Sequence, residues 1–208
     1  MLFEYLKKTY LPGELIIASG IDIGLSDNNR RQQFKVLVDS GKLIRVENGI
    51  YCIPKESRLG GTFIPSAENI ASARYIQRKS DVFGYYSGYV FANRLGLTTQ
   101  MPFVYEIVSN EMTSPVKKII IAEREFVVRK PRTTIDKKNV NVLQLLDLLK
   151  DIDLYCEVPA DERNRIIADY IKSSGISEGV FDKYIPLFPD KIYRNIYEMR
   201  ITNVFAQL

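Results

Sequence analysis

The stretch SDNNRRQQFKVLVDSGKLIRVENGIYCIP, residues 26–54, decides the fold of the first sixty residues. Ser26 is a favourable helix N-cap, and Gly41 is a favourable residue just past a helix end. Between them, Phe34 and Leu37 recur at helical spacing, while Asn, Gln, Arg and Lys occupy most other positions. The pattern predicts a helix with one apolar stripe and a polar face.

A tight hairpin is predicted directly after this helix. The pair Asn48-Gly49 follows the apolar residues Leu43, Ile44 and Val46 and precedes Ile50, Tyr51 and Ile53. Asn-Gly between two β-branched runs is the strongest short hairpin signal, because a type I′ turn needs positive φ at both central residues. We therefore expect two antiparallel strands joined by a type I′ turn.

Two short helices are predicted before the polar helix. Residues 2–10 carry apolar side chains at helical spacing, and residues 14–19 follow the break at Pro12-Gly13. The order of helix, helix, polar-faced helix and hairpin predicts a winged helix-turn-helix over residues 1–60.

Side chains suited to DNA lie on the polar helix and the hairpin. Asn and Gln amides pair with the edge of adenine, and Arg pairs with guanine or with phosphate. We expect phosphate contacts from Arg30 and Arg31, and backbone or minor-groove contacts from Lys42 and Arg45. A solvated helix face, or a winged helix used for protein interaction, is the alternative. The predicted DNA-binding residues are Asn28, Asn29, Arg30, Arg31, Gln32, Gln33, Lys35, Lys42, Arg45 and Asn48.

The rest of the chain predicts a second, mixed α/β domain over residues 61–208, after a polar linker at Lys55–Gly61. It ends in a helical region, so the whole chain is expected to be α+β. Helices are expected at residues 66–79, 88–95, 139–150, 160–174, 178–185 and 191–204, and strands at residues 103–109, 117–121 and 125–129.

Composition excludes several kinds of enzyme. The 208 residues include no histidine, which rules out Ser-His-Asp and Cys-His nucleophile systems and histidine-bound zinc. There is no GxxxxGK[ST] or GxGxxG loop. The carboxylate pairs Asp151/Asp153 and Asp161/Glu162 lie at predicted helix ends, where negative charge is common. We expect no catalytic activity, no cofactor and no metal.

Charge and cysteine content suggest the compartment and the partner. The two cysteines, Cys52 and Cys156, are far apart in sequence and make no disulfide framework. There is no signal-peptide or membrane-spanning run, so a cytoplasmic protein without membrane contact is expected. The net charge of +4 is concentrated in the first two thirds of the chain, which permits a nucleic-acid surface there.

Three stretches carry a family resemblance: Gly49–Tyr51, Pro65–Ala73 and the block GYVFANRLGLTTQMP at Gly88–Pro102. Over roughly residues 1–150 the chain resembles the DUF6088 and AbiEi-type antitoxin family. The resemblance implies an antitoxin of an AbiE-like type IV toxin–antitoxin system, of the abortive-infection type that acts in phage defence. It implies that the winged helix represses the protein's own operon at promoter inverted repeats. It also implies that the C-terminal region counters a nucleotidyltransferase-like toxin without a stable complex.

Six cations around the predicted strands at residues 117–121 and 125–129 are the candidate antitoxicity surface: Lys117, Lys118, Arg124, Arg129, Lys130 and Arg132. They suit a phosphate-rich or acidic partner, or they are the solvated charges that protect an edge strand.

Other readings of the chain remain open. Residues 88–102 form either a ligand loop or a packed helix and turn that Gly96 ends, and the cap favours the second. The alternatives to the antitoxin are a DNA-binding regulator of a plasmid or mobile element without a toxin, and an enzyme with a winged-helix accessory domain.

Overall fold

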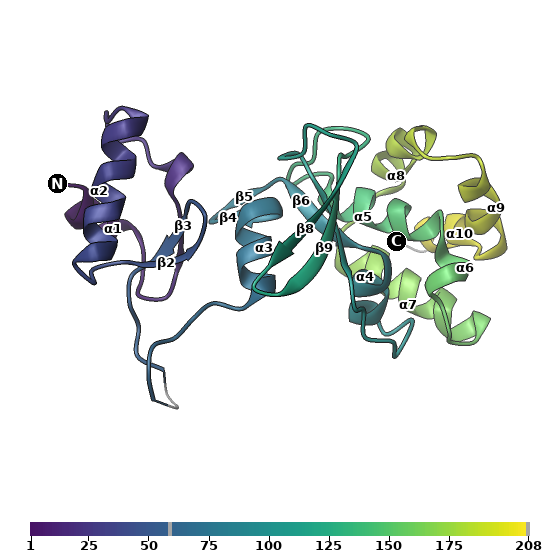
Figure 1. The fold of residues 1–208 in the computed structure, drawn as a ribbon. Helices are drawn as coiled ribbons and strands as arrows, with labels where there is room; N and C mark the ends of the chain where they lie inside the picture. The colour runs from purple at the N-terminus through teal and green to yellow at the C-terminus, as the bar shows by residue number, and fades with distance from the viewer. Residues whose placement is uncertain (58–59, 207–208) are drawn as a thin grey trace. The chain divides into compact units, whose positions relative to one another are not determined.

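The computed structural model describes residues 1–57 and 60–206, which form a mixed α+β structure (Figure 1). Two compact units divide the chain. The first, unit 1, comprises Met1–Arg74 and Ile121–Glu123, and the second, unit 2, comprises Tyr75–Ile120 and the chain from Arg124 onward. The predicted linker at Lys55–Gly61 contains residues 58 and 59, which lie outside the described residues.

Unit 1 contains a three-stranded antiparallel sheet with the strand order β1-β3-β2. Its elements in chain order are α1 (Leu2–Thr9), β1 (Leu15–Ile17), the 3-10 helix η1 (Ala18–Gly20), α2 (Asp27–Asp39), β2 (Ile44–Glu47), β3 (Ile50–Cys52) and α3 (Ala67–Tyr75). The core of the unit joins α1, β1 and α2 through Leu6, Ile16 and Phe34, each fully buried.

The predicted helix at residues 14–19 is wrong. The chain there forms β1, which pairs with β3 so that Ile16 faces Tyr51, and then the single turn η1. The sequence Leu15-Ile16-Ile17 has the β-branched composition of a strand. The backbone hydrogen bonds to β3 stabilise this strand, and they outweigh the local tendency of the segment to form a helix.

The predicted hairpin is confirmed, but its turn is of another type. Gly49 has φ of +74°, whereas Asn48 is not among the described residues with positive φ. The register of β2 against β3 shifts between Arg45 and Glu47, which is a β-bulge. The bulge accommodates a turn with a single positive φ, so the type I′ prediction is wrong here.

Unit 2 contains a four-stranded sheet in the order β6-β7-β9-β8 and a two-stranded β4-β5 ribbon. β6 runs antiparallel to β7, and β7 runs parallel to β9, with Tyr105 opposite Phe126. The strands are β4 (Gln77–Arg78), β5 (Asp81–Val82), β6 (Gly84–Ser87), β7 (Tyr105–Ser109), β8 (Val116–Ile121) and β9 (Arg124–Arg129).

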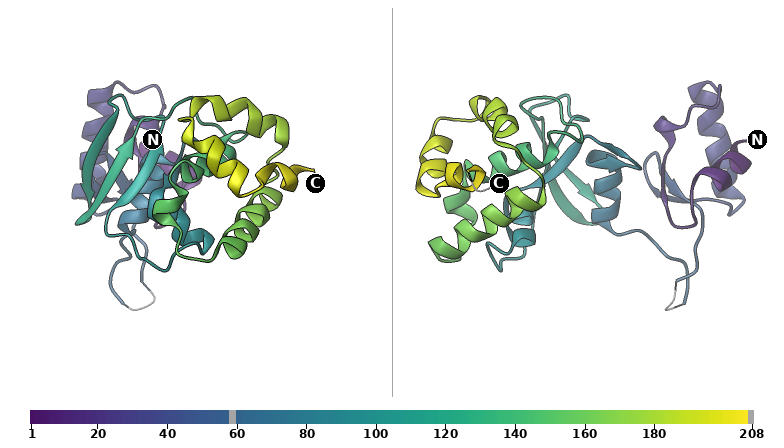
Figure 2. Two further views of the ribbon diagram at one scale, coloured as in Figure 1. Left: turned by 90° about the vertical axis from the view of Figure 1, so that its right-hand side faces the viewer. Right: turned by 180° about the vertical axis from the view of Figure 1, so that it is seen from behind.

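The helices of unit 2 gather on one side of this sheet in both views of Figure 2. A single apolar core joins Tyr85 of β6 and Val108 of β7 to Leu145, Ile171 and Ile196 of the helices. The helices are α4 (Gly88–Leu95), α5 (Val140–Leu149), α6 (Ile152–Tyr155), α7 (Ala160–Ser173), α8 (Glu178–Tyr184), the 3-10 helix η2 (Ile185–Leu187), α9 (Lys191–Glu198) and α10 (Ile201–Phe205).

Most of the elements predicted for residues 61–208 are confirmed within a few residues, with the following differences. The helix predicted to reach residue 79 ends at Tyr75, and the β4-β5 ribbon follows it. β6 and the short helix α6 were not predicted. The helix predicted at residues 191–204 is broken at Arg200, whose φ is +53°. No helix in residues 1–57 and 60–206 has the length and apolarity needed to cross a membrane.

Candidate nucleic-acid interface

The helix α2 begins and ends at the residues that the sequence indicates. The side chain of Ser26 accepts a hydrogen bond from the backbone N–H of Asn29 at 3.4 Å, and Asp27 lies in the first turn. Past the last turn, Gly41 has φ of +70°. Phe34 and Leu37 bury the apolar stripe, and the ring of Phe34 stacks on Tyr51 of β3 at 4.6 Å between centroids. The helix therefore presents its polar face to solvent with fixed ends.

A groove of about 800 Å³ lies between α2 and the β2–β3 hairpin. Arg31 and Lys35 line it from the helix, and Arg45 and Asn48 line it from the hairpin, and all four are exposed. Arg45 Nη2 donates to Asn48 Oδ1 at 2.9 Å, which orients the guanidinium. Asp39 is the acidic residue that lines the groove, so its walls are predominantly cationic.

A second groove, of about 440 Å³, lies on the other side of the same helix, against α1. Asn29, Gln32, Gln33 and Lys42 line it, together with Val36, a residue that is 64% exposed. Lys7 and Lys42 both lie over the ring of Phe3, at 5.6 and 5.5 Å. These amide side chains of α2 therefore line the groove against α1, and its cationic side chains Arg31 and Lys35 line the groove against the hairpin.

The remaining two predicted residues of α2 differ in their surroundings. Asn28 is exposed in the first turn. Arg30 lines the first groove, but its guanidinium donates to the carbonyl of Ile21 at 3.2 Å and to Asp27 Oδ1 at 2.6 Å. Its side chain is 18% exposed. Arg30 thus ties the start of α2 to the preceding loop.

The six cations of the predicted antitoxicity surface are not equivalent. Lys117 and Lys130 are exposed. Lys118 lies 3.2 Å from the carboxylate of Glu125. The guanidinium of Arg124 stacks over Tyr105 at 4.8 Å, and Arg132 donates to the carbonyl of Leu187 at 3.1 Å and stacks over Phe188. The sixth, Arg129, lies inside unit 2.

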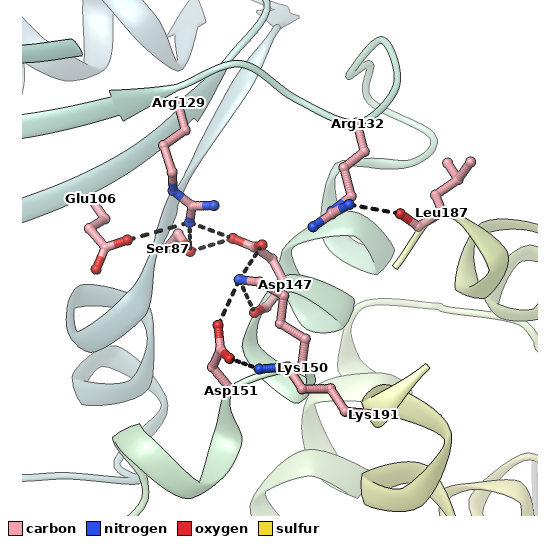
Figure 3. Close-up of polar contacts among 9 residues, drawn as sticks. All are labelled: Ser87, Glu106, Arg129, Arg132, Asp147, Lys150, Asp151, Leu187 and Lys191. Atoms are coloured by element: carbon pink, nitrogen blue, oxygen red, sulfur yellow. Dashed lines mark hydrogen bonds and ion pairs between the residues drawn. The ribbon is translucent and has the colours of Figure 1, made fainter. Parts of the chain in front are cut away.

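Arg129 belongs to a partly buried ionic cluster that connects the sheet to the helices (Figure 3). Its Nη2 lies 3.0 Å from Asp147 Oδ2 on α5 and 3.4 Å from Glu106 on β7. The hydroxyl of Ser87 also donates to Asp147, whose side chain is 4% exposed. Lys150 bridges Asp147 and Asp151 at 2.9 Å each, and Lys191 of α9 pairs with Asp151.

The electrostatics of the cluster keep Asp147 ionised. Burial acts to raise the pKa of Asp147, but the charges of Arg129 and Lys150 and the hydrogen bonds from Ser87 and Lys150 outweigh it and lower the pKa below its ordinary value. Sequence reasoning missed this cluster because its members are far apart in the chain. Only the buried Asp147 in a leucine-rich helix signalled it, since an unpaired charge is costly there.

The block Gly88–Pro102 is a packed helix and turn. Gly96 ends α4 with φ of +82°, as the cap predicts. The carboxylate of Glu157 accepts hydrogen bonds from the side chains of Thr98 and Gln100 and from the backbone N–H of Thr99. These contacts lower the pKa of Glu157. The polar residues of the block therefore fix a loop against the segment after α6.

The four carboxylates of the pairs Asp151/Asp153 and Asp161/Glu162 differ in their surroundings. Asp151 contributes to the ionic cluster, and Asp153, Asp161 and Glu162 are exposed in the first turns of α6 and α7. Within residues 1–57 and 60–206, no three acidic or cysteine side chains converge as a metal ion requires.

Comparison with protein families shows a match over most of the chain. The model of DUF6088, a family of unknown function, matches residues 2–168, which include all of α2, the hairpin, the four-stranded sheet and most of α7. A search of curated proteins finds no match. The match covers most of the chain, and the chain therefore belongs to the DUF6088 family.

Proposed function

We propose that this protein is a DNA-binding autorepressor and the antitoxin of an AbiE-like type IV toxin–antitoxin system. The observation that carries the DNA-binding half is the geometry of α2: an exposed amide-rich helix beside a groove lined by Arg31, Lys35 and Arg45.

The arrangement of unit 1 supports a winged helix-turn-helix. The order α1, β1, η1, α2, β2, β3 and the sheet order β1-β3-β2 match that architecture, with η1 as a shortened first helix of the turn. In this assignment α2 is the recognition helix and the β2–β3 hairpin is the wing. A recognition helix lies in the major groove and reads base edges there.

The side chains of α2 suit that placement. The amides of Asn28 and Gln32 can pair with the N6 and N7 atoms of adenine, and the exposed Val36 can contact the methyl group of thymine. If α2 occupies the major groove and the wing follows the adjacent minor groove, one sugar–phosphate strand lies between them. The cationic groove beside α2 then receives its phosphates.

The antitoxin half rests on a family resemblance. The resemblance of the block Gly88–Pro102 to AbiEi-type antitoxins supports it, and the matched family, DUF6088, is itself of unknown function. We assign neutralisation of a nucleotidyltransferase-like toxin to unit 2, without a stable complex and without catalysis by this chain. The exposed Lys117 and Lys130 are its first candidate contact residues.

Fluorescence anisotropy with the full chain and its own promoter tests DNA binding. We expect tight, salt-sensitive binding to promoter inverted repeats and weaker binding to a scrambled duplex of the same length. Gln32→Ala should reduce the difference between promoter and scrambled duplex, because an amide that reads a base is lost. Equal affinity of the wild type for both duplexes would overturn the proposal.

Co-expression with a nucleotidyltransferase-like toxin tests neutralisation. A chain carrying Asn28→Ala and Gln32→Ala should lose repression of a promoter reporter but still restore growth. A chain carrying Lys117→Ala and Lys130→Ala should keep repression and lose rescue. If the wild type binds the promoter but never restores growth, the alternative holds: the protein is a regulator of a plasmid or mobile element without a toxin partner.

A further inference from the structure

The two edges of the four-stranded sheet differ in exposure. β6, at one edge, is buried at all four of its residues. β8, at the other edge, is exposed at most positions, and the residues Val116 and Ile120 are 57% and 73% exposed. An edge strand presents unpaired backbone N–H and C=O groups that can pair with another chain.

The backbone groups that β8 offers at this edge can be assigned to particular residues. The N–H of Lys130 donates to the carbonyl of Pro115 at 2.9 Å, so Pro115 directs its carbonyl toward the β9 side. In an antiparallel pair, alternate residues direct their backbone groups to the same side. Val116, Lys118 and Ile120 therefore direct theirs to the open edge. Their side chains also share one face, because side chains alternate along a strand.

The charge of Lys118, between two apolar residues, indicates which kind of strand can pair with the open edge of β8. In a symmetric pair of two β8 strands centred on Lys118, the two lysines would lie opposite each other, and like charges in that position are destabilising. Glu125 lies 3.2 Å from Lys118, but this ion pair is exposed and contributes little. Lys117 is exposed as well, but the alternation along β8 places its side chain on the opposite face, so the discrimination falls on Lys118. The edge thus disfavours a second copy and favours an acidic strand.

We propose that β8 is a docking strand that accepts an extended segment of another protein by strand addition. The segment carries an acidic side chain opposite Lys118 and apolar side chains opposite Val116 and Ile120, which gives the pattern apolar-x-acidic-x-apolar. Backbone hydrogen bonds supply affinity in this mode, and alternate side chains supply specificity. None of the predicted DNA-binding residues takes part, so docking goes beyond the DNA binding proposed above.

A designed peptide, SVTETIS, and its partner with lysine in place of glutamate, SVTKTIS, test the proposal. Titrated into the isotope-labelled full chain, the acidic peptide should shift the backbone amide resonances of Val116, Lys118 and Ile120. The lysine peptide should bind at least tenfold more weakly. In Lys118→Glu the preference should reverse. Lys117→Glu is the matched control: it makes the same charge change at a residue whose backbone faces β9, and it should keep the preference for the acidic peptide.

Three outcomes would overturn strand addition at β8: no shifts at millimolar peptide, equal binding of both peptides, or the same reversal in Lys117→Glu. Shifts of the same amides by a mixed-sequence RNA but not by either peptide would also overturn it, in favour of a nucleic-acid partner. Promoter affinity and the thermal unfolding midpoint of Lys118→Glu should equal those of the wild type. The docking result is therefore separate from the result for DNA binding.

Discussion

Asp147 on α5 and Arg129 on β9 form an ion pair, with Oδ2 3.0 Å from Nη2, that joins the four-stranded sheet to the first long helix of the C-terminal region. The two residues are 18 positions apart in the chain. The pair sits where sheet and helices meet, so it contributes to the docking of two layers rather than to either element alone.

Asp147→Asn should lower the free energy of unfolding by about 3 kcal/mol, because it leaves Arg129 and the mostly buried Lys150 without their shared counter-charge. Urea denaturation at pH 7 measures the loss. Asp153→Asn is the control, since it removes the same charge from an exposed position and should change stability by less than about 0.5 kcal/mol. Equal losses in the two variants would contradict a structural role for the pair.

The contribution of Asp147 to the free energy of unfolding should decrease on acidification. The pKa of Asp147 in the folded protein is lowered, while in the unfolded chain it is about 3.9. Stabilisation by the ionised carboxylate is therefore complete above the unfolded pKa and is lost as pH falls toward the folded pKa. The stability difference between wild type and Asp147→Asn should be constant from pH 6 to 8 and shrink below about pH 4. A difference that grows on acidification would contradict this assignment.

Gly84→Ala should destabilise unit 2 by about 3 kcal/mol or more, as overpacking against fixed backbone does. A Cβ there would lie 2.0 Å from the carbonyl oxygen of Tyr75 and 2.7 Å from that of Val108, and neither backbone atom can move away easily. Gly179→Ala is the matched control. A Cβ at Gly179 meets nothing within 4 Å, and alanine has the better helix propensity, so this variant should be neutral or more stable by up to about 1 kcal/mol. Thermal unfolding of both variants measures the contrast.

Glu157→Ala should loosen the loop after α4. Its carboxylate accepts three hydrogen bonds from Thr98, Thr99 and Gln100, so the backbone N–H of Thr99 should exchange with solvent deuterium several-fold faster in the variant. In the wild type, the lowered pKa of Glu157 means that the carboxylate is ionised and the loop is fixed at and above the ordinary pKa of about 4.3, and that the loop is released only as pH falls through the lower pKa of the folded protein. Glu162→Ala, at an exposed position of α7, should leave exchange at Thr99 unchanged.

Arg31→Ala and Arg30→Ala should separate DNA contact from helix stability, given the proposed DNA binding. Arg31 is exposed in the groove, so its loss should weaken binding to all duplexes alike and lower the salt slope by about one. Arg30 already donates to Ile21 and Asp27, so its loss should lower the free energy of unfolding by about 1 kcal/mol and leave the salt slope unchanged. Anisotropy titrations at several salt concentrations, with urea denaturation in parallel, measure both effects.

Sequence alone determined the elements whose ends are marked by local chemistry. α2 lies between the Ser26 cap and Gly41, and α4 ends at Gly96, because caps and left-handed glycines act within one helical turn. The β2–β3 hairpin forms around Asn48-Gly49 for the same reason. The residues of the proposed DNA interface follow from these local signals.

The features that depend on residues distant in the sequence were decided only by the tertiary structure. Residues 15–17 form a strand because β3, more than thirty residues later, offers its edge. The turn at Ala122-Glu123 has positive φ at both residues, whereas the Asn-Gly turn does not, because the bulge in β2 sets its geometry. Arg129 reads as one of six surface cations in the sequence, but folding brings Ser87, Glu106 and Asp147 around it. Apart from the charge of Asp147 within a leucine-rich helix, such a cluster has no local signal, since its stabilisation exists only after the sheet and α5 have packed together.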